Sequence, residues 1–215
     1  MQAITAVLFE PVGCLAEFHA GEFNEIAASV FDLPGDTGQS GSEAYWEMLD
    51  LMQSAAEPLI AEQAGRIERL ELQAVERAHL YEDVESALAE LKGMNITLLI
   101  ASSLSAAAVN RFVDKFSLGG FFSAVWTRDN AGGVKAAPLA RAIEGGSFHP
   151  AQVMSLCDTA DGLNMAKEVG ANAILMFNDY DEGKRLAAHA PAGAIVSLHE
   201  LPDAIRFVAE GAKRG

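Results

Sequence analysis

The sequence is poor in cysteine and in basic residues, and it has no long apolar run. Its two cysteines, Cys14 and Cys157, are too few for a disulfide framework and wrongly spaced for a zinc site. Lysine and arginine number 15 against 30 aspartates and glutamates, and they form no cluster that could follow a phosphate backbone. We therefore expect neither nucleic acid nor an anionic membrane as a partner.

No segment has the features of a targeting or membrane-spanning sequence. The first residues carry no basic region, and no apolar run approaches the ~20 residues that a transmembrane helix needs. A cytoplasmic location is the expectation. In such a reducing compartment both cysteines would be free thiols, which fill space as small apolar groups.

What the sequence does contain is a regular alternation of apolar runs and helical patterns. At 215 residues, half of them hydrophobic, the chain can bury a large core. Continuous apolar runs of strand length are typical of strands buried on both faces. Because helical patterns lie between these runs, we predict an α/β fold with a Rossmann-like parallel sheet and helices on both faces. The runs are Ile4–Phe9, Ile96–Ala101, Phe122–Trp126, Gln152–Cys157, Asn172–Phe177 and a weaker one at Ala194–Leu198.

The first two predicted strands are unusually far apart. Roughly 85 residues separate them, whereas a single crossover helix needs far fewer. Residues 15–80 of this segment have helical patterns throughout, and their clearest loop is the polar, glycine-rich stretch 33–42. We predict that 15–80 form a helical cap domain inserted into a core domain of residues 1–14 and 81–215.

Polar side chains follow four of the predicted strands. In a parallel sheet, the ends of neighbouring strands form the ligand crevice. A carboxylate placed where a buried strand meets solvent is a candidate for catalysis or metal binding. The candidates are Glu10 after the first strand, Ser102 and Ser103 after the second, Lys135 after the third and Asp158 after the fourth.

In this order, and with a helical insert after the first strand, these features resemble the haloacid dehalogenase superfamily of phosphatases and phosphotransferases. The resemblance covers nearly the whole chain and is best in "FFSAVWTRDNAGGVKAAPLARAI" and "CDTADGLNMAKEVGANAI". It implies that Ser102, with Ser103, contacts a phosphoryl group and that Lys135 neutralises its charge. It also implies that Asp158 is a ligand of Mg²⁺.

The first motif of that family departs most from its pattern here. The family has an apolar strand followed by Asp, any residue, Asp, any residue and Thr. This chain has Glu10 at the nucleophile position, Val12 at the acid/base position and Cys14 at the threonine position. Acidic residues that many members carry near Asp158 are replaced by Cys157 or Gly162. The resemblance thus implies a retained phosphate-binding half and a degenerate catalytic half.

The size of the expected defect follows from these substitutions. Glutamate moves the carboxylate by ~1 Å, and a misplacement of that size costs on the order of 100-fold in rate. A lost general acid removes a further ~10² to 10⁴. The product is on the order of 10⁴ to 10⁶, or about 5 to 8 kcal/mol of transition-state stabilisation. Some branches of the superfamily work without the second aspartate, so Glu10 is a stronger objection to catalysis than Val12.

Three functions remain open at this stage. The first is a degenerate member that binds a small anionic or phosphorylated ligand with little or no turnover and holds Mg²⁺ weakly through Glu10 and Asp158. The second is a working hydrolase, phosphatase or dehalogenase-like, that uses Glu10. The third is a non-enzymatic interaction protein whose cap serves a partner or a homodimer.

Purely structural roles are also open. Ser102 or Ser103 could cap the helix that follows them, and Asp158 and Thr159 could cap the helix after the fourth strand. The aromatics Phe23, Tyr45 and Trp46 are expected in the core of the cap.

Overall fold

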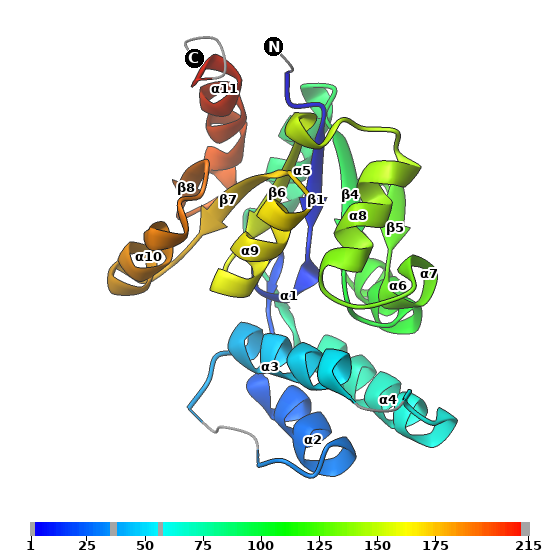
Figure 1. Ribbon diagram of the computed structural model, residues 1–215. Helices are drawn as coiled ribbons and strands as arrows, with labels where there is room; N and C mark the ends of the chain where they lie inside the picture. Colours follow the sequence, from blue (N-terminus) through cyan, green and yellow to red (C-terminus); the bar gives the residue numbers. More distant parts are fainter. Residues whose placement is uncertain (1–2, 35–37, 56–57, 212–215) are drawn as a thin grey trace.

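A parallel sheet of six strands forms the centre of the computed structural model, which describes residues 3–34, 38–55 and 58–211 (Figure 1). Every neighbouring pair in the sheet is parallel. Each predicted apolar run overlaps one of these strands, so the predicted fold class is confirmed. In spatial order the strands are β5 (Ala124–Trp126), β4 (Thr97–Ala101), β1 (Ala6–Phe9), β6 (Val153–Cys157), β7 (Asn172–Met176) and β8 (Gly193–Ile195).

Helices cover both faces of this sheet. Side chains of a strand alternate between the two faces, and in β1 Val7 and Phe9 belong to one apolar cluster while Ala6 and Leu8 belong to another. The first cluster includes residues of α5 (Val84–Gly93), α6 (Ala106–Lys115) and α11 (Leu201–Gly211). The opposite face is covered by α8 (Ala136–Gly145) and α9 (Ala160–Glu168), which lie in front of the sheet in Figure 1.

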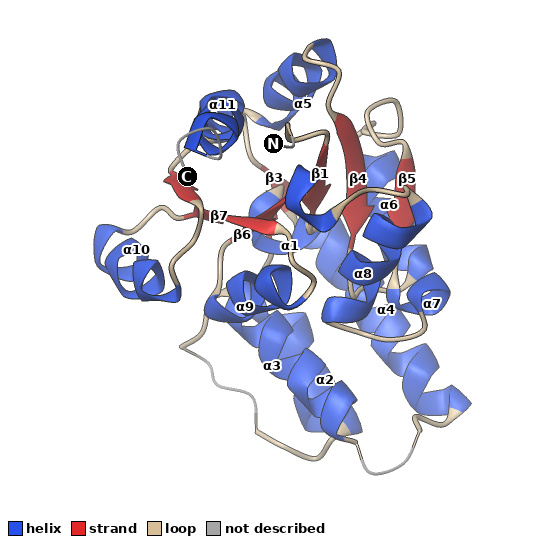
Figure 2. Cartoon of the chain, turned by 45° about the horizontal axis from the view of Figure 1, so that its top comes forward, coloured by secondary structure: helices blue, strands red, loops and turns tan. Residues whose placement is uncertain are grey.

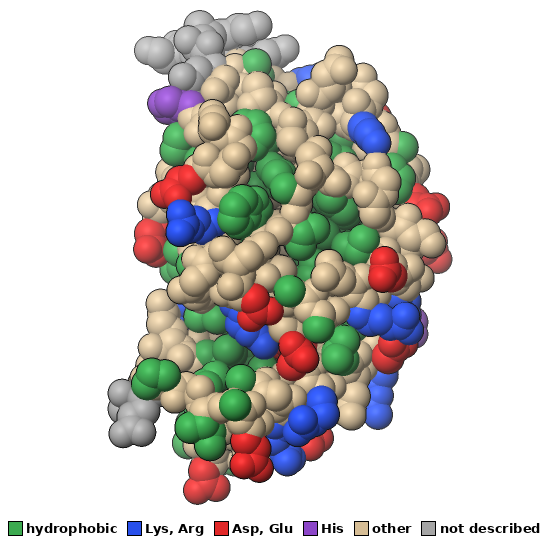
Figure 3. Space-filling view, turned by 90° about the vertical axis from the view of Figure 1, so that its right-hand side faces the viewer, with side chains coloured by type: hydrophobic (Ala, Val, Ile, Leu, Met, Phe, Trp, Pro, Cys, Tyr) green, Lys and Arg blue, Asp and Glu red, His purple; other side chains and the backbone are tan. Residues whose placement is uncertain are grey.

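Three helices between β1 and β4 form a separate layer, which we call the cap. They are α2 (Ala20–Val30), α3 (Gly41–Ser54) and α4 (Ala61–Arg77), and they lie at the bottom of Figure 1. Their apolar faces bury Phe23, Tyr45 and Ile67 completely or almost so. On the lower half of the face in Figure 3, acidic and basic side chains lie next to one another at the surface.

The insert is not helical at its two ends. β2 (Ala16–Glu17) and β3 (His79–Leu80) pair with each other as an antiparallel two-stranded sheet. The helical pattern predicted for 15–80 is wrong there, because a two-residue strand is too short to show an alternating pattern. Within the predicted loop 33–42, residues 35–37 lie outside the described residues.

A tight turn connects β1 to the cap. The four-residue helix α1 (Pro11–Cys14) is broken by Gly13, whose φ of 77° favours glycine. A Cβ at this position would lie 1.8 Å from Asp158 Oδ2, so glycine is also required by close packing. In Figure 2, α1 lies between the sheet and the cap.

The remaining elements are short and complete the core. They are α7 (Arg128–Ala131), α10 (Tyr180–Leu186) and three 3₁₀ turns at Pro150–Gln152, Ala187–His189 and Leu198–Glu200. In the described part of the chain, no helix combines the length and the apolar character needed to cross a membrane.

Candidate active site

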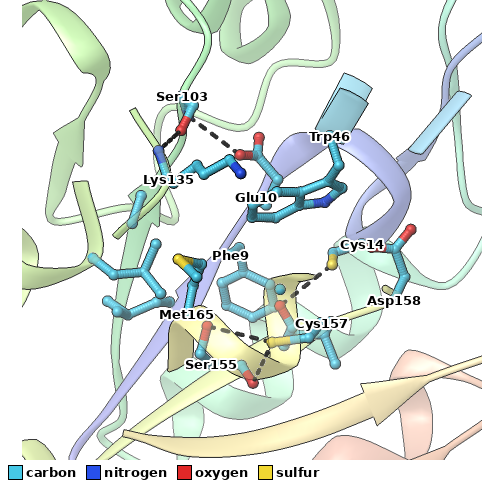
Figure 4. A pocket seen from close by; sticks show the side chains of 15 residues that line it. Phe9, Glu10, Cys14, Trp46, Ser103, Lys135, Ser155, Cys157, Asp158 and Met165 are labelled. Carbon is cyan, nitrogen blue, oxygen red and sulfur yellow. Dashed lines mark hydrogen bonds between the residues drawn. The ribbon is translucent and has the colours of Figure 1, made fainter. Parts of the chain in front are cut away.

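The order of the strands brings most of the predicted site residues to one edge of the sheet. β1 lies between β4 and β6, so Glu10, Ser102 and Asp158 each follow one of three adjacent strands. Lys135 immediately precedes α8. Figure 4 shows Glu10, Ser103 and Lys135 close together on one wall of a cavity, with Asp158 on a different part of the wall.

Donors on Ser102, Tyr45 and Ser103 hold the carboxyl group of Glu10. Ser102 Oγ donates to Oε1 over 2.6 Å, and Oε2 accepts from the Tyr45 hydroxyl at 2.9 Å and from the Ser103 amide at 3.3 Å. Burial raises the pKa of Glu10 to about 7, although these hydrogen bonds pull it down. The carboxyl of Glu10 therefore takes up the hydrogen-bond donors of the Ser102–Ser103 loop. The resemblance assigns the same loop to a phosphoryl group.

Lys135 faces the cap. Its side chain is almost fully buried, at 6% exposed, and its ammonium pairs with the carboxylate of Asp50 in α3. Its backbone amide donates to Ser103 Oγ over 2.7 Å, which ties it to the loop after β4. Its φ of 61° is strained for a residue with a side chain, and such strain is common at functional sites.

The residues predicted for metal binding do not fit magnesium. Mg²⁺ demands near-octahedral oxygen ligands. Val12 is a buried apolar residue, and the carboxyl of Glu10 is engaged by Ser102 and Ser103. Asp158 instead borders Gly13 and Ser42, where burial raises its pKa to about 6. Within the described ranges, no three acidic, histidine or cysteine side chains are grouped closely enough to hold a metal ion.

The cysteines beside this half of the site are buried free thiols. Burial raises the pKa of Cys157 to about 12 and that of Cys14 in the same direction. Cys14 Sγ donates to the Leu156 carbonyl at 3.4 Å. Both therefore behave as the small apolar groups that the sequence predicts.

The capping role predicted for Thr159 is confirmed, whereas Ser102, Ser103 and Asp158 cap none of the helices that the structure describes. Ser105, not Ser102 or Ser103, caps α6 by accepting from the Ala108 amide at 3.2 Å. Thr159 caps α9 by accepting from the Gly162 amide at 3.2 Å. Ser102 and Ser103 instead donate to Glu10, and Asp158 lines the cavity.

The cap supplies three site residues. The sequence predicts Tyr45 and Trp46 in the core of the cap, whereas Asp50 was missed. Tyr45 bonds to Glu10, Asp50 pairs with Lys135, and Trp46 lines the same cavity. Trp46 and Asp50 are four residues apart on α3 and so share a face. That spacing was a usable signal, but the direction in which the face points depends on how the cap packs on the core.

The cavity itself is small. Its volume is about 20 Å³, and its lining includes Glu10, Trp46, Lys135 and Asp158. A space of this size holds a single water molecule. A phosphate ion is too large for the cavity in this form.

The raised pKa of Glu10 predicts a dependence of stability on pH. The folded protein binds this proton more tightly than the unfolded chain, with a pKa of about 7 against 4.5. The contribution of Glu10 to stability is therefore greatest below pH 4.5, and it falls by ~3 kcal/mol as the pH rises from 4.5 to about 7. We expect Glu10→Gln to remove this share of the fall in the free energy of unfolding between pH 5 and 8, as measured by urea denaturation. Asp158 contributes in the same direction, because its pKa is also raised, so a smaller slope remains in the variant.

The exposed cap residue Glu62 offers a control, because Glu62→Gln removes a carboxylate without touching the site. In that variant the free energy of unfolding should fall between pH 5 and 8 with the same slope as in the wild type. Equal slopes for Glu10→Gln and the wild type would show that the carboxyl of Glu10 titrates normally.

Comparison with known proteins identifies the family. Residues 37–176 match the family model of haloacid dehalogenase-like hydrolases, and this range includes Ser102, Lys135 and Asp158. Because the match covers more than half of the chain, the protein belongs to this family, as the resemblance implied.

Solved structures share the fold across almost the whole chain. One is a predicted phosphoglycolate phosphatase from Haemophilus somnus, with 15% identity, a TM-score of 0.65 and coverage of 94% of this chain and 98% of that one. Another is CbbY from Rhodobacter sphaeroides in complex with phosphate, with 22% identity, a TM-score of 0.68 and coverage of 92% and 96%. A mutant of CbbY, similar to the same extent, is in complex with xylulose-(1,5)bisphosphate. No curated protein matches the sequence.

Proposed function

We propose that this protein binds a small anionic, phosphorylated ligand at Ser102, Ser103 and Lys135 and has little or no phosphatase turnover. The observation that carries the proposal is that the Ser102–Ser103 loop already holds the oxygen atoms of an acidic group. The carboxyl of Glu10 accepts from Ser102 Oγ and the Ser103 amide, donors that suit a phosphoryl oxygen equally well. CbbY, which has the same fold, is in complex with phosphate.

Low turnover is expected from the same geometry. A nucleophile must approach the phosphorus atom, whereas the carboxyl of Glu10 is tied to the donors that would hold the phosphoryl oxygens. Val12 offers no proton to a leaving group. The poor fit to Mg²⁺ removes a further source of charge neutralisation. Binding and cleavage are thus separated, since the anion-binding groups persist while the reacting groups do not.

A second candidate, a working hydrolase, is favoured by one observation. The pKa of Glu10 is raised to about 7, and a general base works best when its pKa lies near the operating pH. In this reading Glu10 activates a water molecule, for which the cavity has room. Turnover of the wild type distinguishes this candidate from the first.

Titration with inorganic phosphate, followed by thermal shift and calorimetry, tests the binding. At pH 8, above the raised pKa of Glu10, we expect Glu10→Gln to bind phosphate roughly tenfold more tightly than the wild type, because the competing negative charge is removed. We expect Lys135→Met to abolish binding, since Lys135 provides the cation that faces the cavity.

Lys184→Met is the matched control for the lysine, because Lys184 is an exposed residue of α10. It should bind phosphate like the wild type. If millimolar phosphate stabilises neither the wild type nor Glu10→Gln, the ligand-binding function is wrong and an interaction protein is favoured.

A further inference from the structure

We infer that the cap is held against the core by contacts with the same groups that would bind an anion, so that a bound anion and a closed cap exclude each other. We call this set of contacts between cap and core the clasp. This inference rests on the proposed anion site but concerns its regulation. In effect, two cap side chains, Tyr45 and Asp50, act as internal competitors of the ligand.

Tyr45 provides the first contact of the clasp. Its hydroxyl donates to Glu10 Oε2 at 2.9 Å and accepts from the Ser103 amide at 3.0 Å. The side chain is completely buried and packs on Phe23 in the cap, with ring centroids 5.2 Å apart. The hydroxyl therefore takes up a hydrogen-bond donor of the anion site while its ring remains part of the cap.

Asp50 provides the second contact. Its carboxylate pairs with the ammonium of Lys135, and the lysine side chain is 6% exposed while that of Asp50 is 56% exposed. A phosphoryl group that pairs with Lys135 must compete with Asp50, because both draw on the same nearly buried ammonium. Because Asp50 is half-exposed, solvent can replace Lys135 around it when the cap moves.

A third contact joins cap and core without touching the anion site directly. Glu71 of α4, fully buried, pairs with Arg128 and accepts from the Ser105 amide at 3.1 Å. Arg128 also donates to the Ser103 carbonyl at 3.1 Å. The loop from Ser103 to Ser105 is thus held against the cap, and the Ser105 amide reports whether cap and core are in contact.

The consequence is that a bound ligand opens the cap and does not close it, which we call the inverted response. An anion that takes Lys135 and the Ser103 amide releases Asp50 and Tyr45, so binding favours the open cap. By linkage, opening of the cap raises anion affinity by the same factor. The closed cap is therefore the self-inhibited state of this site.

Hydrogen exchange at the Ser105 amide, measured by NMR on the full chain, tests the clasp without any ligand. Loss of a hydrogen bond to a charged group in Tyr45→Phe should speed this exchange by tens of fold. Asp50→Asn breaks a half-exposed pair and should speed it by about two- to fivefold. Glu62→Gln removes a cap charge far from these contacts and should leave it unchanged.

The Val109 amide, which donates to the Ser105 carbonyl inside α6, controls for unfolding. Its exchange should not change in any of these variants. Unchanged Ser105 exchange in Tyr45→Phe and Asp50→Asn would overturn the clasp, as would equal acceleration at Ser105 and Val109.

Adding inorganic phosphate at about 10 mM to the wild type separates this inference from the proposed function. Faster exchange at Ser105 supports both. Slower exchange means that phosphate binds under a closed cap, which overturns the inverted response but keeps the anion site. If phosphate has no effect while Tyr45→Phe still opens the cap, the clasp stands and the anion-binding function fails.

Discussion

Arg128→Ala is expected to lower the free energy of unfolding by about 3–5 kcal/mol. Arg128 pairs with Glu71, whose side chain is completely buried between cap and core. Burial already raises the pKa of Glu71, and the attraction of Arg128 only partly opposes that rise. Without the arginine, a buried carboxylate loses its partner, and the Ser105 amide alone cannot compensate for its lost hydration.

Denaturant titrations of Arg128→Ala and of two control variants measure the expected loss of stability. Arg141→Ala, which breaks the exposed pair of Arg141 and Glu144, should cost no more than ~1 kcal/mol. Removing both charges in Arg128→Met with Glu71→Leu should recover most of the stability, because no unpaired charge remains buried. A loss below ~1 kcal/mol in Arg128→Ala would show that the Glu71 pair does not hold the cap to the core.

The fold was predictable because its signals are local and repeated. Runs such as Ile96–Ala101 and Gln152–Cys157 are continuously apolar, and they become β4 and β6. The segment between β1 and β4 is too long for one crossover, which predicts an insert. The pairing of Ala16 with Leu80 was not predictable, because the two residues are far apart in the sequence and their strands have two residues each.

The core half of the site was predictable for a different reason. Glu10, Ser102 and Lys135 follow strands or precede a helix, and parallel topology carries them to one edge. The cap half was not predictable in the same way. Which face of α3 meets the core depends on packing between the layers, and only the structure places Tyr45 and Asp50 on Glu10 and Lys135.

The largest kinetic effect is expected for Glu10→Asp combined with Val12→Asp. Shortening the side chain by one methylene withdraws the carboxylate from Ser102 and Ser103, which frees their donors for a phosphoryl group. The second substitution restores an acid at the position where the family has one. We expect phosphomonoester turnover with Mg²⁺ to rise on the order of 10²- to 10⁴-fold over the wild type.

Glu10→Asp with Val12→Asn is the matched control, because asparagine has the size of aspartate but supplies no proton. It should recover far less activity than the pair of aspartates. Equal gains in the two variants would mean that the general acid is not what the site lacks. Val12 is part of the buried core, so a polar side chain there also challenges the fold. Circular dichroism checks this, and we expect the spectra of both variants to match that of the wild type.

Turnover of the wild-type protein on a panel of phosphomonoesters with Mg²⁺ is the most direct test of the proposal that the site binds but does not cleave. We predict a rate on the order of 10⁴-fold or more below the usual enzymatic range of about 1 to 10³ s⁻¹. Wild-type turnover within that range, abolished by Glu10→Ala, would contradict the proposal and establish Glu10 as a catalytic residue.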